Sequence, residues 1–253
     1  MRQRKFRACG RPKVVRAGGF PSTQNGNPRP VNVFELATAP FGWGSAIRGK
    51  RFFHPDGVLA GGVAERVAPA GRGLPIPPSR IVARLSKATG TPGALPDFIG
   101  LALRVSAPQP AGTPWDILLV SAGSGVLSRA VALRPATSWN AQTLTTLMPL
   151  RYQDANWWLR ARTASDIGGA GLALDDVRRR LERGGIEVSL DQACGRGDFT
   201  PLARVSLTAV IDDDVSFDPV VNTAPGVSLH PRWLADLRAR AYRHSRDGRD
   251  ADQ

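Results

Sequence analysis

The sequence has 253 residues, 42% of them apolar and 22% charged, which is ordinary for a globular protein with one sizeable core. No window holds the roughly 18 unbroken apolar residues of a membrane span, and the basic start, Met1 to Arg7, is not followed by the apolar stretch of a secretory signal. These features argue against a transmembrane segment and a secretory leader, and we expect a cytoplasmic protein.

The net charge of +13, carried almost wholly by arginine, has three interpretations. It could form a nucleic-acid-binding surface, a solvated basic surface, or a set of arginines that grip an anionic ligand. No helix-turn-helix, RNA-recognition or zinc-finger pattern accompanies the charge, so nucleic-acid binding is the weakest alternative. Zinc ligation has no support, because the two cysteines and three histidines form no Cys-x-x-Cys or His-x-x-x-His pair.

Residues 1–30 are rich in Arg, Gly, Pro and Asn and show no period, which predicts a flexible basic N-terminal arm. Residues 31–253 are expected to form a single domain, which begins with a short helix over residues 31–39. Four apolar runs that lie close to Gly or Pro then predict strands: Val58–Val67, Arg80–Leu85, Ile99–Val105 and Trp115–Val120.

The second half of the chain mixes helices and strands. A helix is predicted over Ser138–Leu147, with Ser138 as its N-cap, and a second over Asp175–Arg183, which begins with two acidic residues and ends at a Gly-Gly pair. Further strands are predicted over Trp157–Ala161, Ile186–Leu190 and Leu202–Ile211. Short strands bounded by turn residues suit an antiparallel sheet, so the expected fold class is α+β, an antiparallel β-barrel with appended helices.

The last predicted helix begins at Pro231, where the missing N–H costs nothing. It carries Tyr242 with Arg238 four residues before it and Arg246 four after it, so both arginines are neighbours of the ring on the helix surface. Nearby positive charge favours an ionised phenol. Taken alone, this helix is better interpreted as a solvated basic helix with a half-buried tyrosine.

Several segments, taken in order, resemble the core of haem catalases, in the shortened form of the small catalase-like haem proteins. The segments that match the family's motifs are Arg51-Phe52-Phe53-His54-Pro55-Asp56-Gly57-Val58, Arg84-Leu85-Ser86, Asp97-Phe98-Ile99-Gly100-Leu101-Ala102-Leu103, Trp115-Asp116-Ile117, Phe217-Asp218-Pro219 and Pro225 to Tyr242. The spacing from Pro225 to Tyr242 also keeps the family's length. Order and spacing together make the resemblance more specific than any one segment.

The resemblance implies a catalase-like barrel with haem b between the barrel and the C-terminal helix. Tyr242, as phenolate, would be the ligand of the haem iron, and Arg238 would keep it ionised. His54 would lie on the opposite, distal face, with Ser86 hydrogen-bonded to its other ring nitrogen. The residues that would pair with haem propionates are Arg51, Arg84 and Arg249. An arginine within an apolar run such as that of Arg84 also needs a partner if it is buried, and a propionate would supply one.

Two departures from the family bear on activity. No asparagine follows Trp115-Asp116-Ile117, so a peroxide-positioning donor is missing and Ser121 is the candidate replacement. Phe53 stands before the distal histidine, where the family has a smaller residue, and it would reshape the pocket over the haem edge.

The resemblance implies a peroxidase or catalase-like oxidoreductase that acts on hydrogen peroxide or organic hydroperoxides, with an electron donor in the peroxidase case. The departures keep open a haem carrier or sensor without peroxide turnover. Assembly into a homo-oligomer is also left open.

Overall fold

Strands are the main regular structure in the part of the chain that the structure describes. The computed structural model describes residues 57–230 except 108, 110–111, 124 and 126–132. Within these residues the strands are β1 (Gly57–Arg66), β2 (Ser79–Lys87), β3 (Ile99–Val105), β4 (Trp115–Ser121), β5 (Thr143–Thr145), β6 (Leu150–Tyr152), β7 (Ala155–Thr163), β8 (Ile186–Cys194), β9 (Thr200–Val210) and β10 (Ser228–Leu229). One helix, α3 (Leu174–Gly184), lies between β7 and β8 in this part of the chain.

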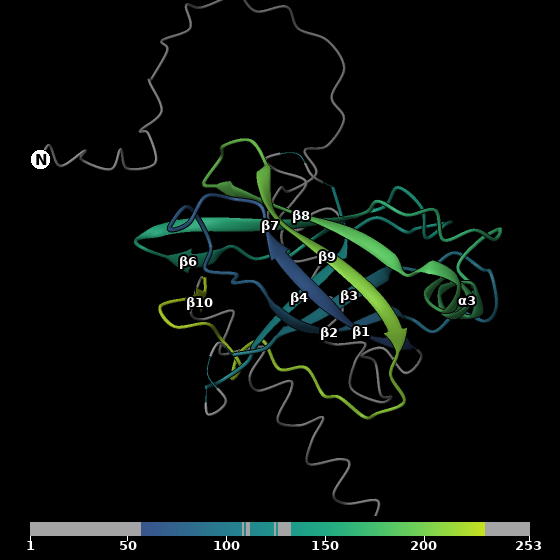
Figure 1. Cartoon of the computed structure of the whole chain (residues 1–253). Helices are drawn as coiled ribbons and strands as arrows, with labels where there is room; N and C mark the ends of the chain where they lie inside the picture. The colour runs from purple at the N-terminus through teal and green to yellow at the C-terminus, as the bar shows by residue number, and fades with distance from the viewer. Residues whose placement is uncertain (1–56, 108, 110–111, 124, 126–132, 231–253) are drawn as a thin grey trace, which may run out of the picture. The chain divides into compact units, whose positions relative to one another are not determined.

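Eight of these strands close into an antiparallel barrel (Figure 1). Their order is β7-β5-β4-β3-β2-β1-β9-β8, and the pairing of β7 with β8 closes the ring. β6 pairs with β7 beyond the end of β5, and β10 pairs with β6. The predicted antiparallel barrel is confirmed, as are the strands predicted at residues 58–67, 80–85, 99–105, 115–120, 157–161, 186–190 and 202–211.

The core fills the inside of the barrel, because alternate side chains of each strand point inward. The largest fully buried members are Trp139, Leu74, Ile76, Ile81, Ile99, Leu103, Leu159, Leu172, Leu181, Ile186 and Leu190. The loop after β1 covers one end of the barrel with Leu74 and Ile76, whose carbonyl oxygens each accept a hydrogen bond of 2.9 Å from the Arg66 guanidinium.

α3 confirms the helix predicted over residues 175–183. Asp175 and Asp176 stand in its first turn and Arg183 in its last, which complements the helix dipole. Val177 and Leu181 are buried in the barrel core, so the apolar stripe of α3 packs against the strands, chiefly β9.

The helix predicted over residues 138–147 is wrong. Ser138 does accept a hydrogen bond from the backbone N–H of Asn140 (3.1 Å), as an N-cap would, but the helix does not continue. The chain turns at Ala141, which has a positive φ, and the following residues form β5 between β4 and β7. Barrel pairing of this threonine-rich segment outweighs its local helix signal.

The predicted arm over residues 1–30, the helix over residues 31–39 and the C-terminal helix lie outside the described residues. No helix in the described part of the chain has the length and apolar character that crossing a membrane requires.

Candidate functional site

Arg84 and Ser86 lie on the same face of β2. The alternating residues Ile81, Ala83 and Leu85 point into the core, so Arg84 and Ser86 point to the outside of the barrel. Ser86 is only 3% exposed, whereas Arg84 is half-buried. Two residues predicted for the haem site therefore share one surface.

The strand register shows what surrounds these two side chains. Ser86 lies opposite Gly57 of β1 and Gly100 of β3, and Gly100 lies opposite Val120 of β4. The next row is Leu59, Arg84, Ala102 and Leu118. We call these eight residues the Arg84–Ser86 face. Apart from one guanidinium and one hydroxyl, its side chains are small or apolar.

Arg84 approaches the start of β1 closely. A methyl group on Gly57 would come within 2.6 Å of Nε of Arg84 and 3.0 Å of the carbonyl oxygen of Leu85. The absence of a side chain at residue 57 thus makes room for the guanidinium. In the sequence, Gly57 is three residues after His54.

Ser121 lies on the inward face of β4, whereas Arg84 and Ser86 lie on the outer face of the barrel. It continues the inward row of Trp115, Ile117 and Leu119, and it is 1% exposed. Its hydroxyl donates to the carbonyl oxygen of Arg134 (2.7 Å) and accepts from the backbone N–H of Ile99 (3.2 Å). The structure therefore does not bring Ser121 together with Ser86, and the side chain of β4 nearest to Ser86 on the outer face is Val120.

Six of the predicted site residues lie outside the described residues, and their roles remain predictions: Arg51, Phe53, His54, Arg238, Tyr242 and Arg249.

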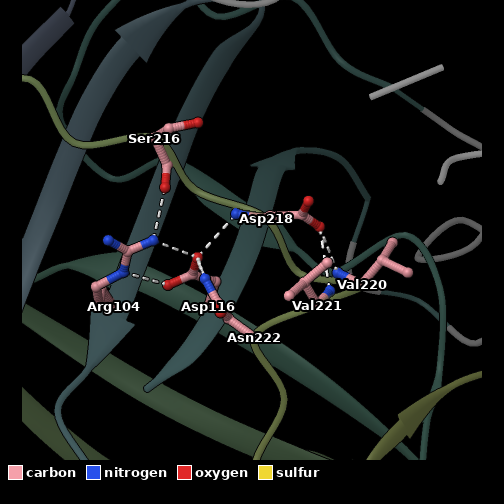
Figure 2. A network of polar contacts seen from close by, with 7 residues as sticks. All are labelled: Arg104, Asp116, Ser216, Asp218, Val220, Val221 and Asn222. Carbon is pink, nitrogen blue, oxygen red and sulfur yellow. Dashed lines mark hydrogen bonds and ion pairs between the residues drawn. The ribbon is translucent and has the colours of Figure 1, made fainter. Parts of the chain in front are cut away.

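Asp116 joins two of the segments that resemble the catalase family (Figure 2). It is 1% exposed, and its Oδ1 and Oδ2 accept hydrogen bonds of 2.7 Å from Nε and Nη2 of Arg104. Its Oδ2 also accepts from the backbone N–H of Asp218 and from Nδ2 of Asn222, both at 2.8 Å. The pKa of Arg104 is raised, chiefly by this hydrogen bond and against the opposing effect of burial.

Sequence reasoning did not assign Asp116 a role. The available signal was a carboxylate within an apolar strand, since a buried charge needs partners.

Asp97 holds the loop that connects β2 with β3. Its carboxylate accepts from the backbone N–H of Thr89 (3.0 Å) and from both the N–H (2.9 Å) and the hydroxyl (3.1 Å) of Thr91. Burial acts to raise the pKa of Asp97, but the hydrogen bonds from Thr91 and Thr89 outweigh it and hold that pKa below its ordinary value. These hydrogen bonds hold the conformation of the loop that leads into Ile99 and Gly100 at the start of β3.

The best-formed cavities within the described residues are small. One, of about 20 Å³, lies between β4 and the segment after β9, and another, of about 10 Å³, lies in the barrel core beside Trp139. Such volumes hold a water molecule at most. Neither of these two cavities could hold a haem, and the Arg84–Ser86 face on the outside of the barrel offers a guanidinium for a carboxylate.

Comparison with solved structures finds catalases. A fungal catalase matches 89% of this chain at a TM-score of 0.59 and 10% identity. Catalase A from Saccharomyces cerevisiae matches 89% at 0.58 and 11% identity, and a bacterial catalase matches 86% at 0.57 and 13% identity.

The chain spans 64%, 67% and 60% of the lengths of these three proteins. No protein-family model matches the sequence, and no curated protein matches it. At these identities the likeness shows the fold alone: the chain has a catalase-like fold.

Proposed function

We propose that this protein is a haem-dependent oxidoreductase that acts on hydrogen peroxide or organic hydroperoxides. The observation that carries the proposal is the shared outward face of Arg84 and Ser86 within a catalase-like barrel. That face adjoins the start of β1, which follows His54 by three residues. The arrangement supports a site to which the predicted distal residues contribute together.

The proposed cofactor is haem b, with Tyr242 as the phenolate ligand of its iron and Arg238 as the charge that keeps the phenol ionised. Arg84 would pair with a haem carboxylate, because a guanidinium fork matches a carboxylate in geometry and charge. Arg51 and Arg249 would pair with the remaining carboxylate oxygens of the haem.

When bound, the haem iron would supply the redox chemistry that cleaves the O–O bond. His54 would accept a proton from one oxygen of the peroxide and return it to the other oxygen, which leaves as water. Ser86 would keep the imidazole oriented through the ring nitrogen that does not meet the peroxide. Phe53 would cover the edge of the pocket, and an organic electron donor would complete the peroxidase cycle.

The test is turnover of the haem-loaded protein, followed as oxygen release and as oxidation of a phenolic donor. We expect His54→Ala to lower the rate by about 10²- to 10⁴-fold, the usual contribution of a positioned proton-transfer group, while the haem absorption remains. The matched control is His230→Ala. His230 is held through its backbone N–H, which donates to the carbonyl oxygen of Pro149, and this substitution should leave the rate unchanged. Full turnover in His54→Ala would contradict the proposal.

A second candidate is a haem carrier or sensor without peroxide turnover. Two observations favour it: Val120 places an apolar side chain on the Arg84–Ser86 face, and Ser121 points inward. Ser86 is therefore the one hydroxyl among the eight residues of that face. Haem absorption together with no oxygen release and no donor oxidation would select this candidate.

A further inference from the structure

Phe98 extends the Arg84–Ser86 face by one row. It lies two residues before Gly100, and its carbonyl oxygen accepts a hydrogen bond from the backbone N–H of Ala88 (2.7 Å), so the pairing of β2 with β3 continues to this residue. Because side chains alternate along a strand, Phe98 lies on the outer side with Gly100, whereas its buried neighbour Ile99 turns inward. An aromatic side chain therefore stands at the edge of this face.

The backbone at Phe98 is fixed by its neighbour Asp97. Oδ1 of Asp97 accepts hydrogen bonds from the backbone N–H of Phe98 (2.7 Å) and from that of Thr89 (3.0 Å). The backbone N–H and carbonyl oxygen of Asp97 also pair with those of Ala136, at 3.2 and 2.8 Å. A side chain on a fixed backbone loses little conformational entropy when a ligand packs against it, so Phe98 is preorganised for binding.

Four side chains surround Gly100 on the outer face. Ser86 of β2 and Val120 of β4 are its partners across the sheet, and Phe98 and Ala102 are its neighbours along β3 on the same side. Ser86 is buried, whereas Phe98, Ala102 and Val120 are half-buried. Three of the four side chains are apolar, and the one polar group is the hydroxyl of Ser86.

This distribution of polar and apolar groups matches one class of peroxide. Hydrogen peroxide carries a hydroxyl at each end and needs hydrogen-bond partners around both. An organic hydroperoxide, ROOH, has one hydroxyl and one apolar group, so it needs polar partners on one side and apolar contacts on the other. Under the proposed function Ser86 marks the side of the proton-transfer group, and Phe98 and Val120 add apolar surface next to it.

We propose that Phe98 and Val120 make this site selective for an organic hydroperoxide over hydrogen peroxide, with Phe98 as the specificity-determining residue. The inference rests on the proposed function, because it takes the Arg84–Ser86 face as part of the peroxide site. In the reaction the O–O bond of ROOH breaks, and two electrons and two protons convert ROOH to ROH and water. The organic donor supplies both electrons and both protons and is itself oxidised.

The kinetic test compares Phe98→Ala with Phe199→Ala in the full-length, haem-loaded chain. Phe199 is the matched control because it is also a half-buried phenylalanine, yet its ring lies 4.3 Å from the guanidinium carbon of Arg160 on β7, a strand that contributes no residue to the Arg84–Ser86 face. The value of kcat/KM is measured for cumene hydroperoxide and for hydrogen peroxide with the same phenolic donor.

We expect Phe98→Ala to lower the ratio of kcat/KM for cumene hydroperoxide to kcat/KM for hydrogen peroxide about ten-fold, because apolar contacts with the substrate are lost. The ratio should stay at its wild-type value in Phe199→Ala. If Phe98→Ala folds poorly, Val120→Thr decides the question: it keeps the shape of the side chain, adds a hydroxyl that favours hydrogen peroxide, and should lower the same ratio.

A binding measurement tests the face without turnover. Cumyl alcohol, the ROH product of cumene hydroperoxide, is titrated into the full-length chain without haem, and the methyl resonances of Val120 and Leu118 are followed by NMR. We expect these resonances to shift and saturate in wild type and in Phe199→Ala. The dissociation constant should be about three- to ten-fold higher in Phe98→Ala, because part of the apolar contact area is removed.

Equal loss of kcat/KM for the two peroxides in Phe98→Ala, or the same change of the ratio in Phe199→Ala, would overturn the inference. Methyl resonances of Val120 and Leu118 that do not respond to cumyl alcohol would also overturn it. If the haem-loaded protein turns over neither peroxide, the proposed function fails. The NMR titration then still decides whether this face binds an apolar ligand beside Phe98.

Discussion

Gly57 determines where the Arg84 guanidinium can lie. A Cβ at residue 57 would meet Nε of Arg84 at 2.6 Å and a backbone oxygen at 3.0 Å, so an alanine there has to displace the side chain or the strand. Displacing an arginine that pairs with a carboxylate removes a charge-assisted hydrogen bond, which is worth about 1.5–3 kcal/mol.

We therefore expect Gly57→Ala to weaken haemin binding by about ten-fold, with a loss of about 1–3 kcal/mol in stability from overpacking. The control is Gly61→Ala on the same face of β1, where the new methyl group meets only the flexible end of Ile211 at 3.2 Å. Haemin titration and urea unfolding of both variants measure the two effects. Equal haemin affinity in wild type and Gly57→Ala would show that Arg84 does not hold the ligand.

Strand parity explains which site residues could be predicted from the sequence. Arg84 and Ser86 are two residues apart, so any regular strand places them on one face, as found. Ser121 was selected for its hydroxyl, but it stands six residues after Trp115, and an even spacing from a buried tryptophan puts it on the core side. The alternation of buried and exposed residues along the strand predicts the orientation of Ser121, whereas the resemblance to a family motif does not.

At the scale of an element, the loop between β2 and β3 depends on one carboxylate. Asp97 has a pKa below its ordinary value of 3.8, so its ionised form stabilises the folded state above that pH, and this contribution is lost as the pH falls through the lowered pKa.

We expect Asp97→Asn to lower the free energy of unfolding by about 1–3 kcal/mol at pH 7, because the N–H groups of Thr89 and Thr91 lose an ionised acceptor. The difference in the free energy of unfolding between wild type and variant should become smaller as the pH falls below about 3.8. Urea unfolding at pH 7, 5 and 3 measures it, with Asp154→Asn, at an exposed surface ion pair, as the control that should change little. A difference in the free energy of unfolding that does not change with pH would contradict this role of the ionised Asp97.

Long-range pairing accounts for the elements that the sequence did not reveal. Residues 143–145 form a strand because β4 and β7 flank them, and β6 and β10, at three and two residues, are too short to show a period. The longer strands and α3 were predictable, since each carries its own alternation or its own start and stop residues.

At the scale of the molecule, the positive charge is unevenly distributed along the sequence. Residues 57–230 contain nearly equal numbers of basic and acidic side chains, so most of the net charge of +13 comes from the flanking residues 1–56 and 231–253. Residues 57–230 thus carry little net charge of their own, and Arg84 is the one arginine of the proposed site that lies among them.

The most direct test of the proposed haem site is the absorption spectrum of the purified chain after titration with haemin. Wild-type protein should bind one haem and show a Soret band, and Tyr242→Phe should lose that band or shift it, because the phenolate ligand is gone. Tyr152→Phe is the control, since Tyr152 is the chain's other tyrosine and its hydroxyl contacts only the side chain of Gln153 in the described structure. Wild-type protein that stays colourless with added haemin, or a Tyr242→Phe spectrum identical to wild type, would contradict the tyrosinate haem site.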